Sequence, residues 1–443
     1  MSIANSLYPD EKVLTGRASY FDIFERTITV FAIVGFTNFI AFALLGGADA
    51  DPTAIFPDVS GPARASWYPI YLAVLIISIV RWRTMLATLP KAWPIILLFT
   101  LAFLSIQWSI APSITVRRCI ALFFTLHFGF YLAARAPLLD TLRLLGWTWL
   151  AITIISLGFI FLLPSKGIDH DAHVGAWTGF LGTKNLMGGE MARAHLIFVG
   201  LLFYDAKHRA AWISGLALTA LCVLGSTSKT ALLAMIAPYG LFAVYMIAHG
   251  SVIISLLSIW GAVSFAGIGY FILANFSDEL VKLIGKDLTF SGRTDIWELC
   301  FFLVSKEKWT GYGYGAFWKV ADGPALFLEK TLEWDVPNAH NSWVEVSLSL
   351  GYPGLAVLII MTIMALTKSM HLMTGRHGPI PLMMLLQLIM FSLSESLLLQ
   401  QNFHSSMLFA FVVSFCLLGK KVPNPVKAAR SSRFDVHRPE RLA

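Results

Sequence analysis

Residues 144–163 read LLGWTWLAITIISLGFIFLL, an apolar run that contains no charged residue. A helix of about 20 such residues crosses a hydrocarbon layer about 30 Å thick. Inside that layer each backbone N–H and C=O group needs a partner within the protein, because no water is there to supply one. The run is therefore predicted to be a membrane-spanning α-helix.

Runs of this kind recur along the chain between Thr27 and Leu418. Hydrophobic residues make up 57% of the 443 residues and charged residues only 13%, far below the roughly 25% of an ordinary soluble domain. We predict an all-α polytopic membrane protein with about twelve transmembrane helices. They cover residues 27–48, 66–80, 92–109, 114–134, 144–163, 188–204, 211–225, 230–248, 252–274, 343–367, 379–399 and 404–418.

The basic residues predict the orientation of these helices, since the short cytoplasmic loops of membrane proteins carry an excess of Lys and Arg. Of the 33 Lys and Arg residues, 19 fall in segments that lie inside when the N-terminus is cytoplasmic, and the remaining 14 fall outside or at outer helix ends. We expect a bacterial inner-membrane protein with both termini in the cytoplasm. The predicted segments are a cytoplasmic N-terminal segment (1–26), helices one to nine (27–274), a periplasmic loop (275–341), helices ten to twelve (342–418) and a cytoplasmic basic tail (419–443).

The net charge of +7 follows mostly from this topological bias, so it does not indicate a nucleic-acid partner. The basic tail is instead expected to lie beside anionic membrane lipid. Three of the four cysteines, Cys119, Cys222 and Cys416, fall within predicted helices. No disulfide framework is predicted from them.

Polar residues gather in four segments near the predicted outer face, where ionisable groups at membrane depth indicate function. The segments are 108–113 with the basic pair that follows it, 182–193, 226–230, and 291–297 together with 338–343. A gathering of cations there favours an anionic ligand, and a diphosphate fits best, because Arg clasps phosphate oxygens as a fork and Lys adds a point charge. The candidate substrate-binding residues are Arg117, Arg118, Lys184, Asn185, Glu190, Arg193, Asn338 and Asn341.

Three further residues are candidates for the chemistry itself: Lys229, Arg293 and His340. Lys229 and Arg293 would face the anionic group, and a neutral imidazole at His340 would accept a proton from a sugar hydroxyl. Alternatives stay open, because Arg side chains also snorkel to lipid headgroups and a His between two Asn residues also caps a helix.

Two acidic pairs are candidate metal ligands, namely Asp49 with Asp51, and Asp169 with Asp171 beside His173. Both lie in turn-like segments, where Asp is common for backbone reasons. We therefore predict no metal ion and no cofactor.

The segment Gly311–Gly315 is expected to turn, and it lacks the preceding strand and the spacing of a nucleotide-binding loop. Aromatic residues in and after it would either stack on sugar rings or pack the loop itself. They are Tyr312, Tyr314, Phe317 and Trp318. Before them, Ser291 and Thr294 are plausible caps for a helix over residues 295–305.

Taken together, these motifs resemble the O-antigen ligase and polymerase superfamily. The motifs that carry the resemblance are Trp108-Ser109 before the basic pair, Gly182-Thr183-Lys184-Asn185, Ser228-Lys229-Thr230, Gly292-Arg293-Thr294-Asp295-Ile296-Trp297, Gly311-Tyr312-Gly313 and Asn338-Ala339-His340-Asn341-Ser342. The exopolysaccharide-polymerase branch is the most similar, since there a His-Asn-Ser-Trp stretch leads into a Gly-Tyr-Pro-Gly helix like residues 351–354. The resemblance extends over roughly residues 95–415.

The resemblance implies a metal-independent membrane glycosyltransferase of GT-C-like helical fold, with a long periplasmic loop after helix nine, that uses glycans carried on undecaprenyl diphosphate. By similarity, Lys229 and Arg293 would bind the diphosphate and His340 would act on the acceptor hydroxyl. Many members have Arg at the position of Lys229, and Lys cannot form the same fork. A flippase and a chain-length regulator are the implied partners.

The function predicted is polymerisation of lipid-linked oligosaccharide repeat units into exopolysaccharide outside the inner membrane. A ligase that moves glycan onto another acceptor, such as lipid A core, is the alternative, because only the acceptor would differ. A transporter or flippase is a third hypothesis. It predicts functional charges near the midplane of the membrane rather than at one face.

Overall fold

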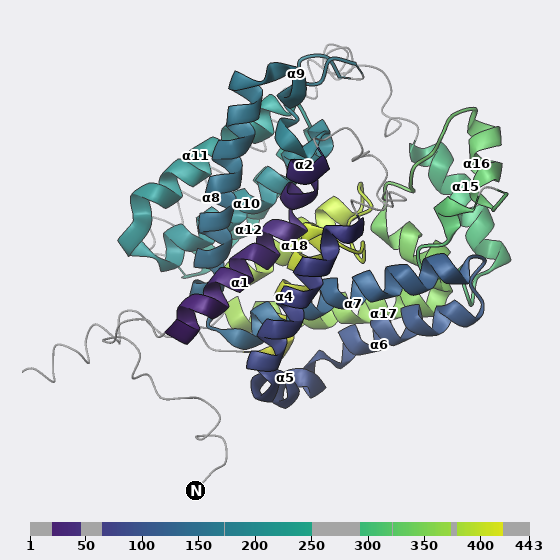
Figure 1. Cartoon of the computed structure of the whole chain (residues 1–443), viewed down its shortest axis with the longest axis horizontal. Helices are drawn as coiled ribbons and strands as arrows, with labels where there is room; N and C mark the ends of the chain where they lie inside the picture. The colour runs from purple at the N-terminus through teal and green to yellow at the C-terminus, as the bar shows by residue number, and fades with distance from the viewer. Residues whose placement is uncertain are drawn as a thin grey trace, which may run out of the picture.

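The structure is a computed structural model, and it describes residues 20–45, 64–171, 173–249, 293–320, 322–373 and 379–419. These residues form α-helices joined by short 3-10 turns, and the described ranges contain no strand beyond one isolated bridge between Ile168 and Trp177. The helices pack into one bundle (Figure 1). The predicted all-helical, multi-pass membrane class is confirmed at this level.

Six described helical segments are long and apolar enough to cross a membrane: Trp82–Gln107, Pro112–Arg135, Leu138–Leu162, Lys184–Tyr204, Ala206–Gly225 and Ser342–Leu372. Four shorter apolar helices accompany them, at Trp67–Val80, Lys229–Tyr245, Ile380–Ser392 and His404–Leu418. The predicted helix at 252–274 lies outside the described residues. The number of twelve therefore stays a prediction.

Several helix boundaries differ from the predicted ones because of particular residues. The first predicted helix is divided into α1 (Tyr20–Phe36) and α2 (Phe39–Leu45) at Asn38, whose φ of 61° is left-handed. Helix α10 (Lys184–Tyr204) begins four residues early, since the Thr183 side chain accepts a hydrogen bond from the Leu186 amide at 3.3 Å. Helix α18 (Ile380–Ser392) ends seven residues before the predicted boundary. The chain thus leaves the helix at residues 393–403.

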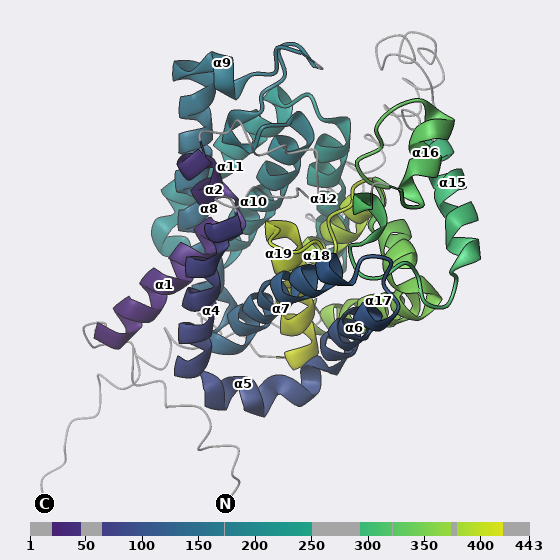
Figure 2. The same ribbon diagram turned by 45° about the vertical axis from the view of Figure 1, so that its right-hand side comes forward.

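The remaining long helices are α4 (Trp67–Val80), α6 (Trp93–Leu104), α7 (Pro112–Arg135), α8 (Leu138–Leu162), α11 (Arg209–Gly225), α12 (Lys229–His249) and α17 (Ser342–Met373). Helix α17 bends at Gly351, whose φ of 63° and ψ of −165° are not helical. The short helix α5 (Trp82–Thr88) links α4 to α6 across one end of the bundle (Figure 2). Lys91, just after it, donates to the carbonyl of Leu418 at 3.4 Å, so this link and the end of α19 (His404–Leu418) share that end.

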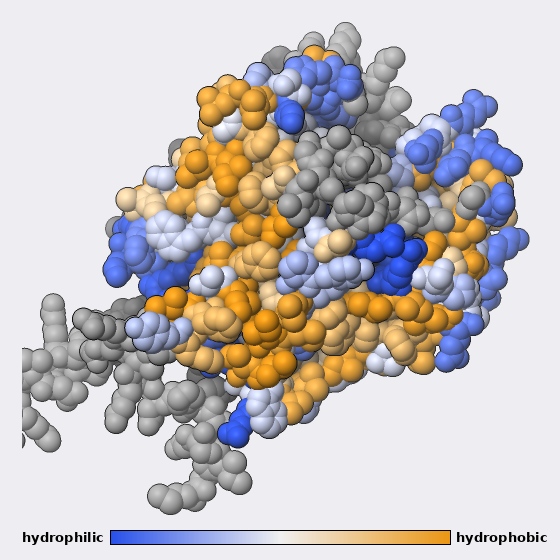
Figure 3. Space-filling model, viewed as in Figure 1, coloured by the Kyte–Doolittle hydropathy of each residue, from blue (hydrophilic) through white to orange (hydrophobic). Residues whose placement is uncertain are grey.

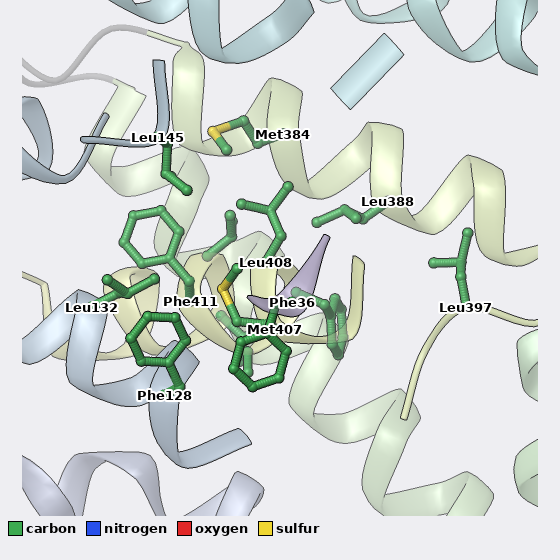
Figure 4. Close-up of a cluster of buried hydrophobic side chains, with 14 of the residues drawn as sticks. Phe36, Phe128, Leu132, Leu145, Met384, Leu388, Leu397, Met407, Leu408 and Phe411 are labelled. Atoms are coloured by element: carbon green, nitrogen blue, oxygen red, sulfur yellow. The ribbon is translucent and has the colours of Figure 1, made fainter. Parts of the chain in front are cut away.

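Helix α19 occupies the middle of the bundle, and all 15 of its residues are buried. Its closest neighbour is α7, where a Cβ added to Gly129 would lie 2.5 Å from the carbonyl oxygen of Met407. Small residues allow such close approach of two backbones in membrane proteins. Figure 4 shows Phe128 of α7 pointing toward Met407, and Phe128 also stacks on Phe36 at 5.3 Å.

The outer surface of the bundle is apolar over a broad band, and hydrophilic residues collect toward its ends (Figure 3). Leu72 and Ile79 of α4 are 58% and 70% exposed. Apolar side chains left uncovered over a wide area match a lipid solvent rather than water.

Residues 293–320 and 322–341 fold into a small cap beside α17, where Figures 1 and 2 both place α15 (Arg293–Lys306) and α16 (Ala325–Leu332). The cap has its own hydrophobic cluster, which includes Ile296, Phe317 and Leu328. The prediction of Thr294 as a helix cap is wrong, because α15 already begins at Arg293. Ser291 lies outside the described residues.

Candidate functional site

A cavity of about 200 Å³ opens where the start of α10, the end of the cap and the segment after α18 meet. Its lining includes five of the predicted site residues: Lys184, Asn185, Arg193, Asn338 and His340. The other lining residues are Asp169, His173, Thr183, Leu186, Phe391, Glu395, Ser396, Leu397 and Phe403. Segments far apart in sequence thus converge on one space.

The turn before α12 is tied to the start of α10. The hydroxyl of Ser228 donates to Asn185 Oδ1 at 3.0 Å, and a Cβ on Gly188 would lie 2.6 Å from the Ser226 hydroxyl oxygen. Lys229 follows this turn and is close enough to Lys184 for their charges to repel. Two cations are therefore held near each other at this edge of the cavity, although Lys229 is not among its lining residues.

His340 lies in a strained backbone position beside the cavity. Its φ of 48° is left-handed, and its amide donates to the side-chain oxygen of Asn338 at 2.7 Å. The ring atom Nδ1 lies 3.4 Å from Glu395 Oε2, and the other oxygen of Glu395 accepts from Arg293 Nη2 at 2.9 Å. A second hydrogen bond runs from Arg293 to the carbonyl of Ser394. The order Arg293, Glu395, His340 is a continuous chain of polar contacts.

Glu395 is a carboxylate in this chain. Burial by itself raises the pKa of Glu395, but the hydrogen bond from His340 and the positive charge of Arg293 outweigh it, so the net pKa lies below its ordinary value. An ionised carboxylate only accepts hydrogen bonds, so His340 contributes Nδ1–H to this contact. In the neutral ring Nε2 then carries the lone pair, which is the form that a general base requires.

A second buried carboxylate, Glu345, holds the backbone around His340 in place. It accepts from the Ala339 amide at 2.7 Å, the Trp318 indole at 2.9 Å and the Ser396 hydroxyl at 3.2 Å. These three donors come from the loop just before His340, from the 3-10 turn at Phe317–Lys319 and from the segment after α18. Glu345 therefore joins the three elements that surround the histidine.

Asn341 does not line the cavity, and its side chain instead caps a helix. Its side-chain oxygen accepts from the amides of Trp343 and Val344 at 2.9 and 3.3 Å, which caps the start of α17. Its side-chain nitrogen donates to the carbonyl of Leu393 at 3.2 Å.

Glu190 and Arg193 form a buried ion pair inside the bundle, with Arg193 Nη2 2.8 Å from Glu190 Oε1. Glu190 also accepts from the Ser405 hydroxyl at 2.9 Å and from His404 Nδ1 at 2.6 Å. The guanidinium of Arg193 lies over the ring of Phe391, 4.9 Å from its centroid. Arg193 reaches the cavity, whereas Glu190 lies behind it and is not among the lining residues.

Arg117 and Arg118 are not among the residues that line the cavity. Arg118 is buried and donates to the carbonyl of Gly315 in the cap, while Arg117 is exposed at the start of α7. The preceding Trp108 likewise donates to the carbonyl of Thr310 at 2.8 Å. This segment therefore anchors the cap to α7.

The cap aromatics are packed rather than available for sugar stacking. Tyr312, Tyr314, Phe317 and Trp318 are all less than 9% exposed. The Tyr312 hydroxyl donates to the carbonyl of Leu303 at 2.9 Å. Of the two predicted roles, loop packing is the one observed.

The carboxylate of Asp169 lines the cavity but also accepts from the Asp171 amide at 2.9 Å, the geometry of an Asx turn. Burial, followed by the charge of Lys184, lowers the pKa of His173. Among the described residues, no group of three His, Cys, Asp or Glu side chains is arranged to hold a metal ion. Asp49 and Asp51 lie outside the described residues.

Glu395 and His404 were missed by the sequence analysis. Both lie within predicted transmembrane runs, at 379–399 and 404–418, where an ionisable residue signals function or a buried partner. Glu395 gave this signal, but the prediction placed it inside a membrane helix that ran to residue 399. In the structure the helix ends at Ser392, so Glu395 lies in the segment that follows it.

Two comparisons with known proteins concern the family that the chain resembles. Residues 214–359, which contain Lys229, Arg293 and His340, match the family described as O-antigen ligase. The chain is also 24% identical to the exopolysaccharide production protein ExoQ of Rhizobium meliloti (strain 1021), over 68% of this chain and 69% of that protein. The resemblance to the O-antigen ligase and polymerase superfamily, predicted from the motifs, is thereby confirmed.

Proposed function

We propose that this protein polymerises oligosaccharide repeat units carried on undecaprenyl diphosphate into exopolysaccharide at the periplasmic face of the inner membrane. The observation that carries the proposal is the polar chain from Arg293 through Glu395 to His340, which ends at a cavity also lined by Lys184 and Arg193. A base and several cations around one cavity match the needs of glycosyl transfer from a diphosphate.

The acceptor hydroxyl would lie near Nε2 of His340. Its oxygen attacks the anomeric carbon of the donor, its proton passes to Nε2, and the bond from that carbon to the diphosphate oxygen breaks, with the electron pair leaving on the diphosphate. Attack opposite the leaving group inverts the anomeric configuration. A base of this kind accelerates transfer by about 10²–10⁴-fold.

The cations would stabilise the charge that develops on the leaving diphosphate. Lys229 and Arg293 are proposed for this role by their match to the family positions, and Lys184 is near enough to Lys229 to share it. Arg293 is paired with Glu395 through one nitrogen, so further N–H groups of its guanidinium can face a phosphate. Transfer of this kind proceeds without a metal ion.

The proposed topology places both termini in the cytoplasm and the cap in the periplasm. A flippase would deliver the lipid-linked donor and acceptor, and a chain-length regulator would work beside the polymerase. The second candidate is a ligase, which the description of the matching family favours. Both reactions use the same donor, and they differ only in the acceptor hydroxyl.

Deletion of the gene tests the proposal. Lipid-linked glycans are extracted from the deletion strain and sized. We expect single repeat units on the lipid carrier and no polymer, with recovery on complementation. Full-length polymer retained on the carrier would identify a ligase, and unchanged pools would refute glycan transfer.

A further inference from the structure

Two side chains at the inner end of the cavity carry hydrogen-bond donors that nothing in the described structure uses. Arg193 is 2% exposed and Asn338 is fully buried, and both line the cavity. Within the described ranges, Nε and Nη1 of Arg193 and Nδ2 of Asn338 have no hydrogen-bond partner. Native proteins keep few buried donors unpaired, and donors that line a cavity can be satisfied by a molecule bound there.

The neighbouring carboxylate, Glu190, does not take up these donors. Its oxygens accept from Arg193 Nη2, the Ser405 hydroxyl and His404 Nδ1. The indole of Trp149 donates to His404 Nε2 at 3.2 Å. An indole N–H only donates, so Nε2 of His404 is the acceptor of this hydrogen bond. Arg193 and His404 thus hold Glu190 through different oxygens.

The same contacts fix the guanidinium in position. Glu190 holds Nη2, and Phe391 covers one face of the group at 4.9 Å. The contacts with Glu190 and Phe391 therefore fix the orientation of the other two nitrogens, Nε and Nη1, without a ligand. A donor set arranged in advance binds an anion without the loss of side-chain freedom that a mobile arginine would suffer.

Asn338 is oriented just as firmly. Its Oδ1 accepts from the His340 amide at 2.7 Å, so the nitrogen Nδ2 is the atom left for the cavity. Asn338 is two residues from His340, so its free donor is next to the proposed base. Both unused groups only donate, which selects a ligand rich in acceptor oxygens.

The site lies well inside the bundle. Arg193 follows Lys184 by nine residues in α10, a distance of roughly 13 Å along the helix axis at about 1.5 Å per residue. Of the lining residues, His173 is exposed and Asp169 half-buried, whereas Arg193 and Asn338 are buried, so these last two lie at the inner end of the cavity.

We propose that Arg193 and Asn338 form an oxyanion-binding subsite at the inner end of the cavity, separate from the pair Lys229 and Arg293. It binds a negatively charged oxygen group of the substrate, which is either a phosphate of the lipid diphosphate or the carboxylate of an acidic sugar. The inference rests on the proposed function, since that function supplies the substrate.

Two conservative variants test the subsite in the full chain, purified in detergent. Asn338→Asp keeps the oxygen that accepts from His340 and replaces the free donor with a negative oxygen. Arg193→Lys keeps the charge beside Glu190 and removes the guanidinium donors. The matched control is Asn402→Asp, since Asn402 Oδ1 also accepts a hydrogen bond, from the Tyr71 hydroxyl at 2.7 Å, and Asn402 does not line the cavity.

Calorimetric titration with inorganic diphosphate and with methyl glucuronoside measures the binding. We expect at least one of the two to bind, with affinity reduced about tenfold or more by Asn338→Asp, reduced also by Arg193→Lys, and unchanged by Asn402→Asp. An effect on diphosphate alone assigns the subsite to the phosphate, and an effect on the glucuronoside alone assigns it to an acidic sugar.

Failure to bind either anion, or equal affinity in both variants and the wild type, overturns the subsite. The proposed function is read separately, by elongation of lipid-linked repeat units with the wild-type protein. Elongation together with unaltered anion binding in the variants refutes only the subsite. Normal anion binding without elongation refutes only the proposed polymerase activity.

Discussion

The carboxylate of Glu395 joins His340 to Arg293, and the variant Glu395→Gln tests whether transfer depends on that link. In the wild type its two oxygens lie 3.4 Å from His340 Nδ1 and 2.9 Å from Arg293 Nη2. Glutamine keeps one acceptor oxygen and puts an NH₂ donor in place of the other, so one charge-assisted hydrogen bond is lost. Such a bond contributes about 1.5–3 kcal/mol, which corresponds to transfer slower by roughly 10- to 150-fold.

The assay is the initial rate of elongation of a lipid-linked repeat unit by purified protein. Glu298→Gln provides the matched control, because Glu298 is exposed on α15 and the substitution removes the same charge from the same helix as Arg293. We expect the control to retain the wild-type rate within about twofold, as exposed substitutions away from a site do.

A double variant separates positioning from direct catalysis. If Glu395 acts through the imidazole, Glu395→Gln combined with His340→Ala should be no slower than His340→Ala alone, because residues that act as a unit are not additive. Two results would refute the reasoning: a rate for Glu395→Gln within threefold of wild type, or a double variant slowed by the product of the two single effects.

Further predictions follow from the same structure. His340→Ala should insert and bind donor normally yet elongate about 10²–10⁴-fold more slowly in the purified assay, and a rate within threefold of wild type would place the base elsewhere. Lys229→Arg should retain more donor affinity than Lys229→Ala, while Arg293→Lys should bind donor poorly in membrane titrations, since it loses the guanidinium fork. A reporter active only in the cytoplasm, fused after Asp322, should be silent, and activity there would reverse the topology. Gly129→Val should lower the stability measured by thermal unfolding by about 1–3 kcal/mol or more, because its added atoms meet the Met407 carbonyl; an unchanged transition would contradict the packing of α7 on α19.

The long apolar runs were sufficient to predict the helical membrane class and most helices. Helix α19 was predicted at its observed boundaries, since its run begins at a turn and ends at Gly419. The short Asn38 break and the early end of α18 were not predicted, because their polar residues, Thr37-Asn38 and Ser394-Glu395-Ser396, are few within long apolar runs. These breaks depend on backbone conformations such as the left-handed φ of 58° at Leu399, which tertiary contacts impose.

The site was predictable in part. Lys184, Arg193 and His340 were predicted because charged or polar residues near an apolar run indicate function. All three line the cavity. Arg118 shares that sequence signal, yet its hydrogen bond goes to the cap carbonyl of Gly315. Sequence spacing does not distinguish an arginine that holds a loop from one that faces a cavity. The difference depends on which residues, distant in sequence, the fold brings next to the arginine.

The complete burial of α19 has a consequence for biogenesis. This helix follows every other described helix along the chain, yet all its residues are enclosed by helices made earlier. The earlier helices therefore reach their final packing only after α19 has been synthesised. A chain that stops before residue 404 would contain Arg193 and His340 but would lack His404 and Ser405, which hold Glu190.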